Sequence, residues 1–346
     1  MLLEILVAGA IAFLGTFLSG LYFIPILIKM GMIETDINKR GKPILPASGG
    51  LIVLFGLILG EIALIFSLDY LVTANIDITF LLLSLISIMI VTFIGFMDDM
   101  AGGKIRTSKV KIKTLLKDYS EAGGGLKQRE KMLLTLVGVL PLIAINFGPA
   151  ALFIPHIGTI YFNQILFTFI IIPIAFLFSA NVFNMLEGLN GLSLQMGLVA
   201  VVAMGILSFH YADFTEFSIA ALISGALLAY LYYGSYPAKI LPGDSFTYFM
   251  GSSFAVLAIV GSTKALAIIL ILPWLAEFVL KARARFHAHS WGVLQKDGTL
   301  SSPHKDKIYS LTHIFLRSGK FKEWQIVSIF TLIEVALAAI GLAVFW

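Results

Sequence analysis

Long apolar runs separated by polar segments constrain this chain more than any other feature. About twenty consecutive apolar residues cross the hydrocarbon core of a bilayer, and the 346-residue chain contains ten such runs. A mean hydropathy of +0.96 and a hydrophobic share of 59% exclude a soluble globular domain. We therefore predict an all-α integral membrane protein with about ten transmembrane helices, at residues 3–28, 49–68, 78–97, 131–148, 164–182, 190–209, 215–233, 244–261, 264–281 and 325–345.

The lysine and arginine residues predict how these helices are oriented. All of the 24 basic residues except Lys264 fall on one alternating set of loops. Basic loops face the cytoplasm, so the N- and C-termini are predicted to be extracytoplasmic. We expect a single polytopic domain over residues 1–346 with large cytoplasmic loops at about 98–130 and 282–323. Membrane orientation also explains the net charge of +4, so no nucleic-acid partner is expected.

Two adjacent carboxylates follow the third predicted span. Asp98 and Asp99 come directly after the apolar run 78–97, and a basic stretch follows at residues 104–113. A charge in hydrocarbon costs roughly 3 kcal/mol or more, so such residues usually serve a function. Carboxylates beside basic residues suit a divalent cation that contacts a polyanionic substrate. The alternative is a helix end followed by a solvated run of charges.

A second polar cluster ends the fifth span. Asn181, Asn184 and Glu187 are spaced three apart, so they share one face of a helix. The glycines of residues 188–191 then open the backbone before the next span begins. Amide and carboxylate oxygens in this arrangement can bind a hard cation. The alternative is a polar contact between helices, in which asparagine joins two membrane segments.

Two further polar clusters lie on the same predicted face. Asp244 and Ser245 open the eighth span, where capping of the helix is the alternative interpretation. Histidine can donate hydrogen bonds to phosphate oxygens, so the last loop is a candidate phosphate- or sugar-binding segment; the alternative is a solvated basic loop. Four of the six histidines lie in this loop: His287, His289, His304 and His313. The chain has no cysteine, which excludes thiolate metal ligands.

In this order, the four clusters resemble the polyprenyl-phosphate N-acetylhexosamine-1-phosphate transferases, which form glycosyltransferase family 4. The resemblance covers nearly the whole chain. Glu187 and Asn190 stand where bacterial members tend to carry aspartates, and residues 243–246 are similar to the dolichyl-phosphate N-acetylglucosamine-phosphotransferase branch. In the last loop, His287-Ala-His289 replaces the Arg-His-Arg run of that branch. We therefore place the chain as an archaeal relative of the eukaryotic enzyme.

This resemblance implies a reaction. N-acetylglucosamine 1-phosphate, or a related N-acetylhexosamine 1-phosphate, would pass from a UDP-N-acetylhexosamine to a polyprenyl or dolichyl phosphate, and UMP would be released. The active site would face the cytoplasm, at the cell membrane in a prokaryote. Mg²⁺ would be the cofactor, and Mn²⁺ could substitute for it. A homodimer is one possible oligomeric state. We favour direct displacement by the lipid phosphate over a covalent aspartyl intermediate.

The resemblance also implies roles for individual residues. Asn184 and Asp244 match the metal ligands of the family. Asp99 would support the metal through water. Asp98 would orient or deprotonate the lipid phosphate.

Charge on the transferred phosphate also needs a cation. Lys109 is our candidate, and Lys104 and Lys111 are close competitors. The substrate-binding residues that we expect are Asn181, Glu187, Asn190, Gly191, Ser245, His287 and His289.

Two other classes of membrane protein could also carry buried polar residues. A proton-coupled transporter would also use buried carboxylates, but transporters place them near the bilayer midplane and often show repeated halves. Here the polar clusters lie at one face and no repeat is visible. A CDP-alcohol phosphotransferase is discarded because its Asp-Gly-x-x-Ala-Arg signature is absent.

Overall fold

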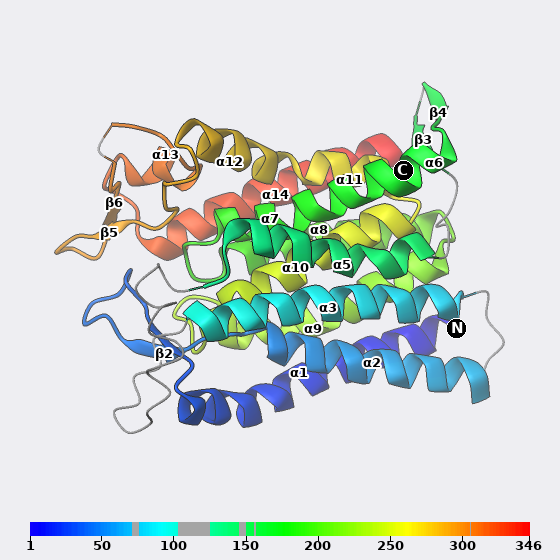
Figure 1. Cartoon of the computed structure of the whole chain (residues 1–346), viewed down its shortest axis with the longest axis horizontal. Coiled ribbons are helices and arrows are strands. Elements are labelled where there is room, and N and C mark those ends of the chain that lie inside the picture. Colours follow the sequence, from blue (N-terminus) through cyan, green and yellow to red (C-terminus); the bar gives the residue numbers. More distant parts are fainter. Residues whose placement is uncertain (71–75, 103–124, 145–149, 156, 305) are drawn as a thin grey trace.

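A computed structural model describes residues 1–70, 76–102, 125–144, 150–155, 157–304 and 306–346. Over these residues the chain forms an elongated bundle of helices with small hairpins at its two ends (Figure 1). The predicted helical class is therefore confirmed. The long helices are α1 (Leu2–Met30), α2 (Gly50–Tyr70), α3 (Ile78–Gly102), α5 (Gln128–Ala144), α7 (Ile172–Leu186), α8 (Leu192–His210), α9 (Phe214–Gly234), α10 (Gly243–Val260) and α14 (Glu323–Phe345).

Two predicted spans are interrupted helices. The fifth span consists of α6 (Gln164–Leu166), a π-helical turn η2 (Phe167–Ile171) and α7. The ninth span consists of α11 (Lys264–Leu270) and α12 (Leu272–Arg283), which are bent by 50°. Pro273 explains the break, because proline has no N–H for the helical ladder.

Seven helices of the described part are long and apolar enough to cross a membrane, or eight if the bent pair counts as one span. The two other predicted spans coincide with α5, which has 17 residues, and with α10. The multi-pass membrane class is thus supported, and the number of ten crossings stays a prediction.

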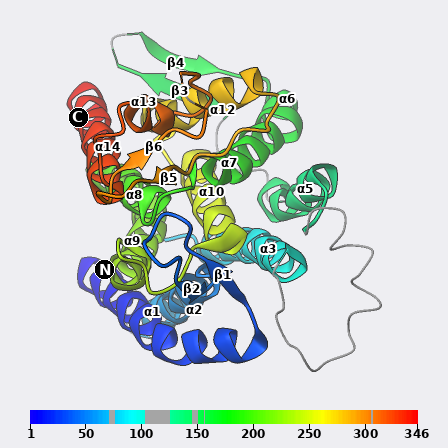
Figure 2. The same ribbon diagram turned by 90° about the vertical axis from the view of Figure 1, so that its left-hand side faces the viewer.

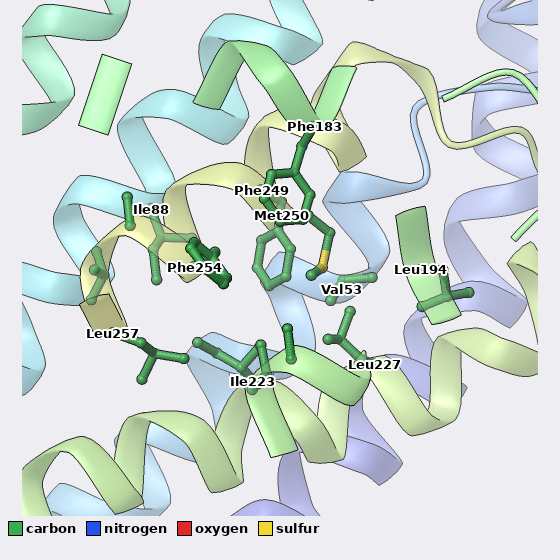
Figure 3. Close-up of a cluster of buried hydrophobic side chains, with 14 of the residues drawn as sticks. Val53, Ile88, Phe183, Leu194, Ile223, Leu227, Phe249, Met250, Phe254 and Leu257 are labelled. Atoms are coloured by element: carbon green, nitrogen blue, oxygen red, sulfur yellow. The ribbon is translucent and has the colours of Figure 1, made fainter. Parts of the chain in front are cut away.

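The interior position of α10 explains its modest apolarity. This helix packs against α2, α3, α7, α8, α9 and α11. Figure 3 shows its Phe249, Met250 and Phe254 among side chains from the surrounding helices. Because lipid does not surround α10, small polar residues are tolerated, and Gly251 allows close contact with the backbone of Ser179 on α7.

The two ends of the bundle differ. Both termini and the hairpin of β3 (Ala151–Ile154) and β4 (Gly158–Tyr161) lie at one end (Figure 1). At the other end lie the hairpin of β1 (Ile33–Thr35) and β2 (Ile44–Pro46), the hairpin of β5 (Val293–Leu294) and β6 (Leu300–Ser301), and α13 (Thr312–Leu316). Figure 2 looks onto this second end. We call it the loop end; its assignment to the cytoplasm stays a prediction.

Candidate active site

Asp99 caps helix α10 from a different helix. Its carboxylate, at the end of α3, accepts hydrogen bonds from the backbone N–H of Asp244 at 2.6 Å and of Ser245 at 3.1 Å. The Ser48 hydroxyl donates to the same carboxylate at 2.8 Å. The first N–H groups of a helix need acceptors and favour a negative charge. Asp99 supplies both the acceptors and the negative charge. The Asp244 side chain is therefore not needed to cap α10, which was the alternative interpretation of its position in the sequence.

Lys131 joins the two remaining carboxylates of the site. Its ammonium, on α5, forms ion pairs with Asp98 and with Asp244, the latter at 2.7 Å. The backbone N–H of Leu126 donates to Asp98 at 2.6 Å. Because one ammonium pairs with both carboxylates, the lysine offsets the repulsion between two like charges.

The asparagines of α7 complete the cluster. The Asn184 side-chain amide lies beside the Asp244 carboxylate. One turn earlier, the Asn181 amide donates to the Leu177 carbonyl at 2.8 Å and accepts from the Tyr248 hydroxyl at 3.3 Å. Asn181 and Asn184 share a face of α7 as predicted, whereas Glu187 follows the end of the helix in extended backbone, and all three line one cavity.

This cavity has a volume of about 740 Å³ and is lined by both polar and apolar side chains. The polar side chains include Lys131, which pairs with Asp98 and Asp244, and those of the α7 asparagines, Lys281 and His289. The apolar side chains are those of Ile174, Leu177, Phe178, Phe278 and Phe286. A ligand that carries both a charged group and a hydrocarbon group fits such a space.

The turn between α7 and α8 depends on two glycines. Gly191 has φ +86°, a left-handed conformation that favours glycine. At Gly188 a Cβ would come within 2.8 Å of the Ser290 carbonyl carbon, so only glycine lets the last loop approach here. The predicted backbone opening is therefore present.

Glu187 lies in this turn, and its carboxyl group has a raised pKa. Its carboxylate accepts from the Ser193 backbone N–H at 3.2 Å. Burial raises the pKa of Glu187 to about 7, and the hydrogen bond from Ser193 opposes that rise. Burial thus favours the protonated form of Glu187, whose side chain lines the cavity.

Asn190 takes part in a buried network between loops. Its side-chain amide donates to Asp36 at 2.8 Å, and its backbone N–H donates to Glu323 at 2.7 Å. Lys39 forms ion pairs with both of these carboxylates. This network joins the first loop, the α7–α8 turn and the start of α14. Asn190 thus connects the α7–α8 turn to the first loop and to α14. Its contact with substrate stays a prediction.

The two histidines predicted to bind substrate are placed differently. The His289 ring lines the cavity and stacks on Trp291, with ring centroids 3.9 Å apart. His287 is exposed and is not part of the cavity lining. Burial and the nearby Lys281 lower the pKa of His289. His289, rather than His287, is therefore the loop histidine beside the site.

The oxygen donors of the site suit Mg²⁺. Among the described residues, no group of three or more histidine or carboxylate side chains is arranged to hold a metal ion. Asp98, Asp244 and Asn184 nevertheless bring two carboxylates and an amide together. Mg²⁺ usually meets only one or two carboxylates and takes its other ligands from phosphate and water. Asp99 is less suited to direct ligation, since both its oxygens already accept hydrogen bonds.

The sequence prediction and the structure differ on the lysine of the site. Lys109 lies outside the described residues, as do Lys104 and Lys111. The structure instead places Lys131 between Asp98 and Asp244, a role that we had not predicted. Its signal in the sequence is weak: it is the last basic residue before an apolar run. The other expected residues of the cluster, Asp98, Asp99, Asn184, Asp244 and Ser245, are brought together.

Comparisons with known proteins agree on one family. The model of glycosyl transferase family 4 matches residues 80–262, which hold the aspartate pair and the α7 and α10 motifs. A protein of Sulfolobus acidocaldarius, provisionally named UDP-N-acetylglucosamine–dolichyl-phosphate N-acetylglucosaminephosphotransferase, is 32% identical over 98% of this chain and 96% of its own length. A protein of the same name from Saccharolobus solfataricus is 32% identical over the same shares. The phospho-N-acetylmuramoyl-pentapeptide-transferase of Clostridium perfringens is 25% identical over 98% of both chains.

Proposed function

The chain belongs to glycosyl transferase family 4, and we propose that it transfers N-acetylglucosamine 1-phosphate from UDP-N-acetylglucosamine to a polyprenyl or dolichyl phosphate. UMP is the second product. The family and the archaeal relatives named for this activity support the proposal. A related N-acetylhexosamine donor is the alternative, since other relatives are named for the transfer of phospho-N-acetylmuramoyl-pentapeptide.

The observation that carries the proposal is the position of the Asp98–Lys131–Asp244 cluster beside a cavity lined by both polar and apolar side chains. A prenyl phosphate likewise combines a charged and a hydrocarbon part. Its phosphate would meet Lys131 and Asn184, and its first isoprene units would meet Phe178 and Phe278. A membrane enzyme can in this way take one substrate from the bilayer and the other from water.

The reaction requires two anions to approach each other. An oxygen of the lipid phosphate attacks the sugar-linked phosphorus of the UDP-sugar, a new P–O bond forms, and the bond to the UMP phosphate breaks. A monoester phosphate has its second pKa near 6, so it is largely a dianion at neutral pH and needs little help from a base. We therefore assign Asp98 to orienting the lipid phosphate, and Lys131 to offsetting negative charge.

A divalent cation fits this assignment. Asp244 and Asn184 would hold Mg²⁺, and Asp99 would keep Asp244 in place through the start of α10. When bound, the ion supplies positive charge that offsets the charge on the diphosphate. Lys131 carries its ammonium on a flexible stem, so it can turn from the carboxylates towards phosphate oxygens.

The test is an assay of UMP release. Purified protein is incubated with Mg²⁺, a prenyl phosphate and a panel of UDP-sugars. We expect UMP only when both substrates and the metal are present, and the highest rate with UDP-N-acetylglucosamine. A flux of substrate into proteoliposomes without any UMP would instead support the proton-coupled transporter, which the family assignment disfavours.

A further inference from the structure

Glu277 is a buried carboxylate that the proposed reaction does not use. It lies in α12, its side chain is 0% exposed, and both of its oxygens accept hydrogen bonds from the last loop. The Ser290 hydroxyl donates to one oxygen at 3.2 Å. The Ser310 hydroxyl donates to the other at 3.0 Å, and the Leu311 backbone N–H donates to it at 2.7 Å. One carboxylate thus holds two segments of the loop that are twenty residues apart.

Lys281 is the second buried charge of the same helix. Its ammonium lies 3.6 Å from Glu277, one turn away, and donates to the Ala288 carbonyl at 2.6 Å. Lys281 is only 6% exposed. A buried charge is costly unless it is paired and hydrogen-bonded, and here each charge satisfies that need for the other. The pair therefore ties α12 to residue 288 as well.

The tied segment is the one that faces the cavity. Ala288, His289, Ser290 and Trp291 are consecutive and all line it. The single Ser290 hydroxyl proton is shared between Glu277 and the Met185 carbonyl at the end of α7, which is the nearer acceptor at 2.8 Å. Gly188, beside Glu187 and three residues from Met185, lets the backbone of Ser290 pack directly against the α7–α8 turn. The segment is thus fixed between a membrane helix and the turn that carries Glu187.

We propose that the Glu277–Lys281 pair positions residues 288–291 for recognition of the nucleotide-sugar donor. The inference rests on the proposed function. It follows from three facts: the pair is buried, it bonds four residues of one loop, and the loop places the stacked His289 and Trp291 rings at the cavity. Aromatic faces and a histidine N–H suit the sugar and phosphate groups of such a donor. Glu277 acts through the loop, so it is a positioning residue.

The main test compares Glu277→Gln with Glu334→Gln. Glutamine keeps the shape of Glu277, but its amide cannot accept from Ser310 and Leu311 and pair with Lys281 at the same time. Glu334 is the matched control, because it is also 0% exposed in a membrane helix and its carboxylate oxygens have no hydrogen-bond partner in the described structure. Steady-state rates of UMP release are measured against the concentration of each substrate.

We expect Glu277→Gln to raise the KM for UDP-N-acetylglucosamine roughly tenfold or more, the scale seen when a supporting hydrogen-bond partner is lost. The KM for prenyl phosphate should change by less than about twofold, since the apolar residues Ile174, Leu177 and Phe178 of α7 are untouched. Ser310→Ala removes one of the three bonds and should act in the same direction with a smaller effect. If Glu277→Gln does not fold, this milder variant decides the question.

A second readout does not depend on activity. The natural chain has no cysteine, so Ala288→Cys provides one thiol in the tied segment, where Ala288 is 6% exposed. We expect slow labelling by maleimide in this background and labelling at least severalfold faster when Glu277→Gln is added. The control Glu334→Gln should leave the rate unchanged.

The outcomes separate the two proposals. An unchanged donor KM with an unchanged labelling rate would refute the positioning role, as would an equal rise of both KM values. If the wild-type protein releases no UMP with any UDP-sugar, the proposed function fails. The labelling rates then still decide whether Glu277 holds the loop, and faster labelling would support that structural part alone.

Discussion

Asp99 at the end of α3 holds the backbone N–H of Asp244 at the start of α10, 2.6 Å away. The contact joins two helices whose residues are 145 positions apart in the chain. Because Asp98 and Asp99 are neighbours, this contact sets the position of Asp244 along the bundle axis beside Asp98. The adjacent aspartates therefore have different roles. Asp99 holds the start of α10 in position, and Asp98 forms the ion pair with Lys131.

Asp99→Asn should reduce both stability and activity. The amide group loses the negative charge at the start of α10 and offers only one accepting oxygen to three donors. Loss of a helix cap costs about 1–2 kcal/mol, so we expect a lower melting temperature and a large loss of UMP release. The control is Asp77→Ala, which removes the side-chain cap of α3 at the other end of the bundle. It should lower the melting temperature only; a full rate in Asp99→Asn would contradict the assignment.

If Asp244 and Asn184 both hold the metal ion, loss of either side chain should reduce activity to a similar extent. Asp244→Ala and Asn184→Ala should each reduce sugar-phosphate transfer by roughly a thousandfold, because a lost ligand removes several kcal/mol of charge stabilisation. Chelation of divalent cations should abolish the activity of the wild-type protein. Asn163→Ala is the control, since Asn163 caps α6 at the opposite end of the bundle. Full activity in chelator, or in Asp244→Ala, would remove the metal from the mechanism.

Apolar runs were sufficient to predict the helices, because the bilayer requires each spanning segment to satisfy its own backbone. The polar clusters were predicted to share one face of the membrane, and the family resemblance implied that Asp98, Asn184 and Asp244 lie together, as they do in the structure. Long-range partners could not be predicted in this way. Periodicity gives the face on which a residue lies, but not which distant side chain packs against that face.

Three particular residues illustrate this limit. Lys131 reads as the last basic residue before a span, and only the packing of α5 beside α3 brings it to Asp98. The cap of α10 comes from Asp99 rather than from the Asp244 and Ser245 side chains, since the partner is far away in the chain. Glu277 carried no assigned role, because its partners are residues of a folded loop.

The predicted orientation can be measured with single cysteines. Lys296 lies in the last loop and is exposed, whereas Ile157 lies at the opposite end and is 74% exposed. If basic loops face the cytoplasm, an impermeant maleimide added to intact cells should label Ile157→Cys and not Lys296→Cys. Permeabilised cells provide the control, in which both should react. Labelling of Lys296→Cys from outside would reverse the topology and contradict a cytoplasmic nucleotide-sugar site.

Acid should loosen the last loop through His313. Its Nδ1 accepts from the Tyr309 backbone N–H at 3.2 Å, and its Nε2–H donates to the His289 carbonyl at 2.8 Å, so the ring must be neutral. Burial lowers the pKa of His313 from 6.5 to about 4. The stability that the neutral ring contributes is therefore complete above pH 6.5 and is lost as the pH falls towards 4.

The check is the melting temperature of the wild-type protein and of His313→Gln between pH 7 and pH 4. The variant should be less stable at pH 7, and the difference between the two proteins should shrink as the pH falls. His210→Gln, at the opposite end of the bundle, controls for the loss of a histidine. A difference that stays constant over this range would show that His313 does not contribute the pH dependence.

The last prediction decides which lysine offsets phosphate charge. Lys131 contacts both Asp98 and Asp244, so Lys131→Met leaves two carboxylates facing each other without a cation and removes a donor to the substrate. We expect UMP release to fall by at least about a hundredfold, as for the loss of a charge-stabilising donor. Lys109→Met is the matched comparison, because the sequence alone favoured that lysine. A severe loss in Lys109→Met together with near-normal rates in Lys131→Met would restore the original assignment, and Lys131 would then be a structural partner of the carboxylates.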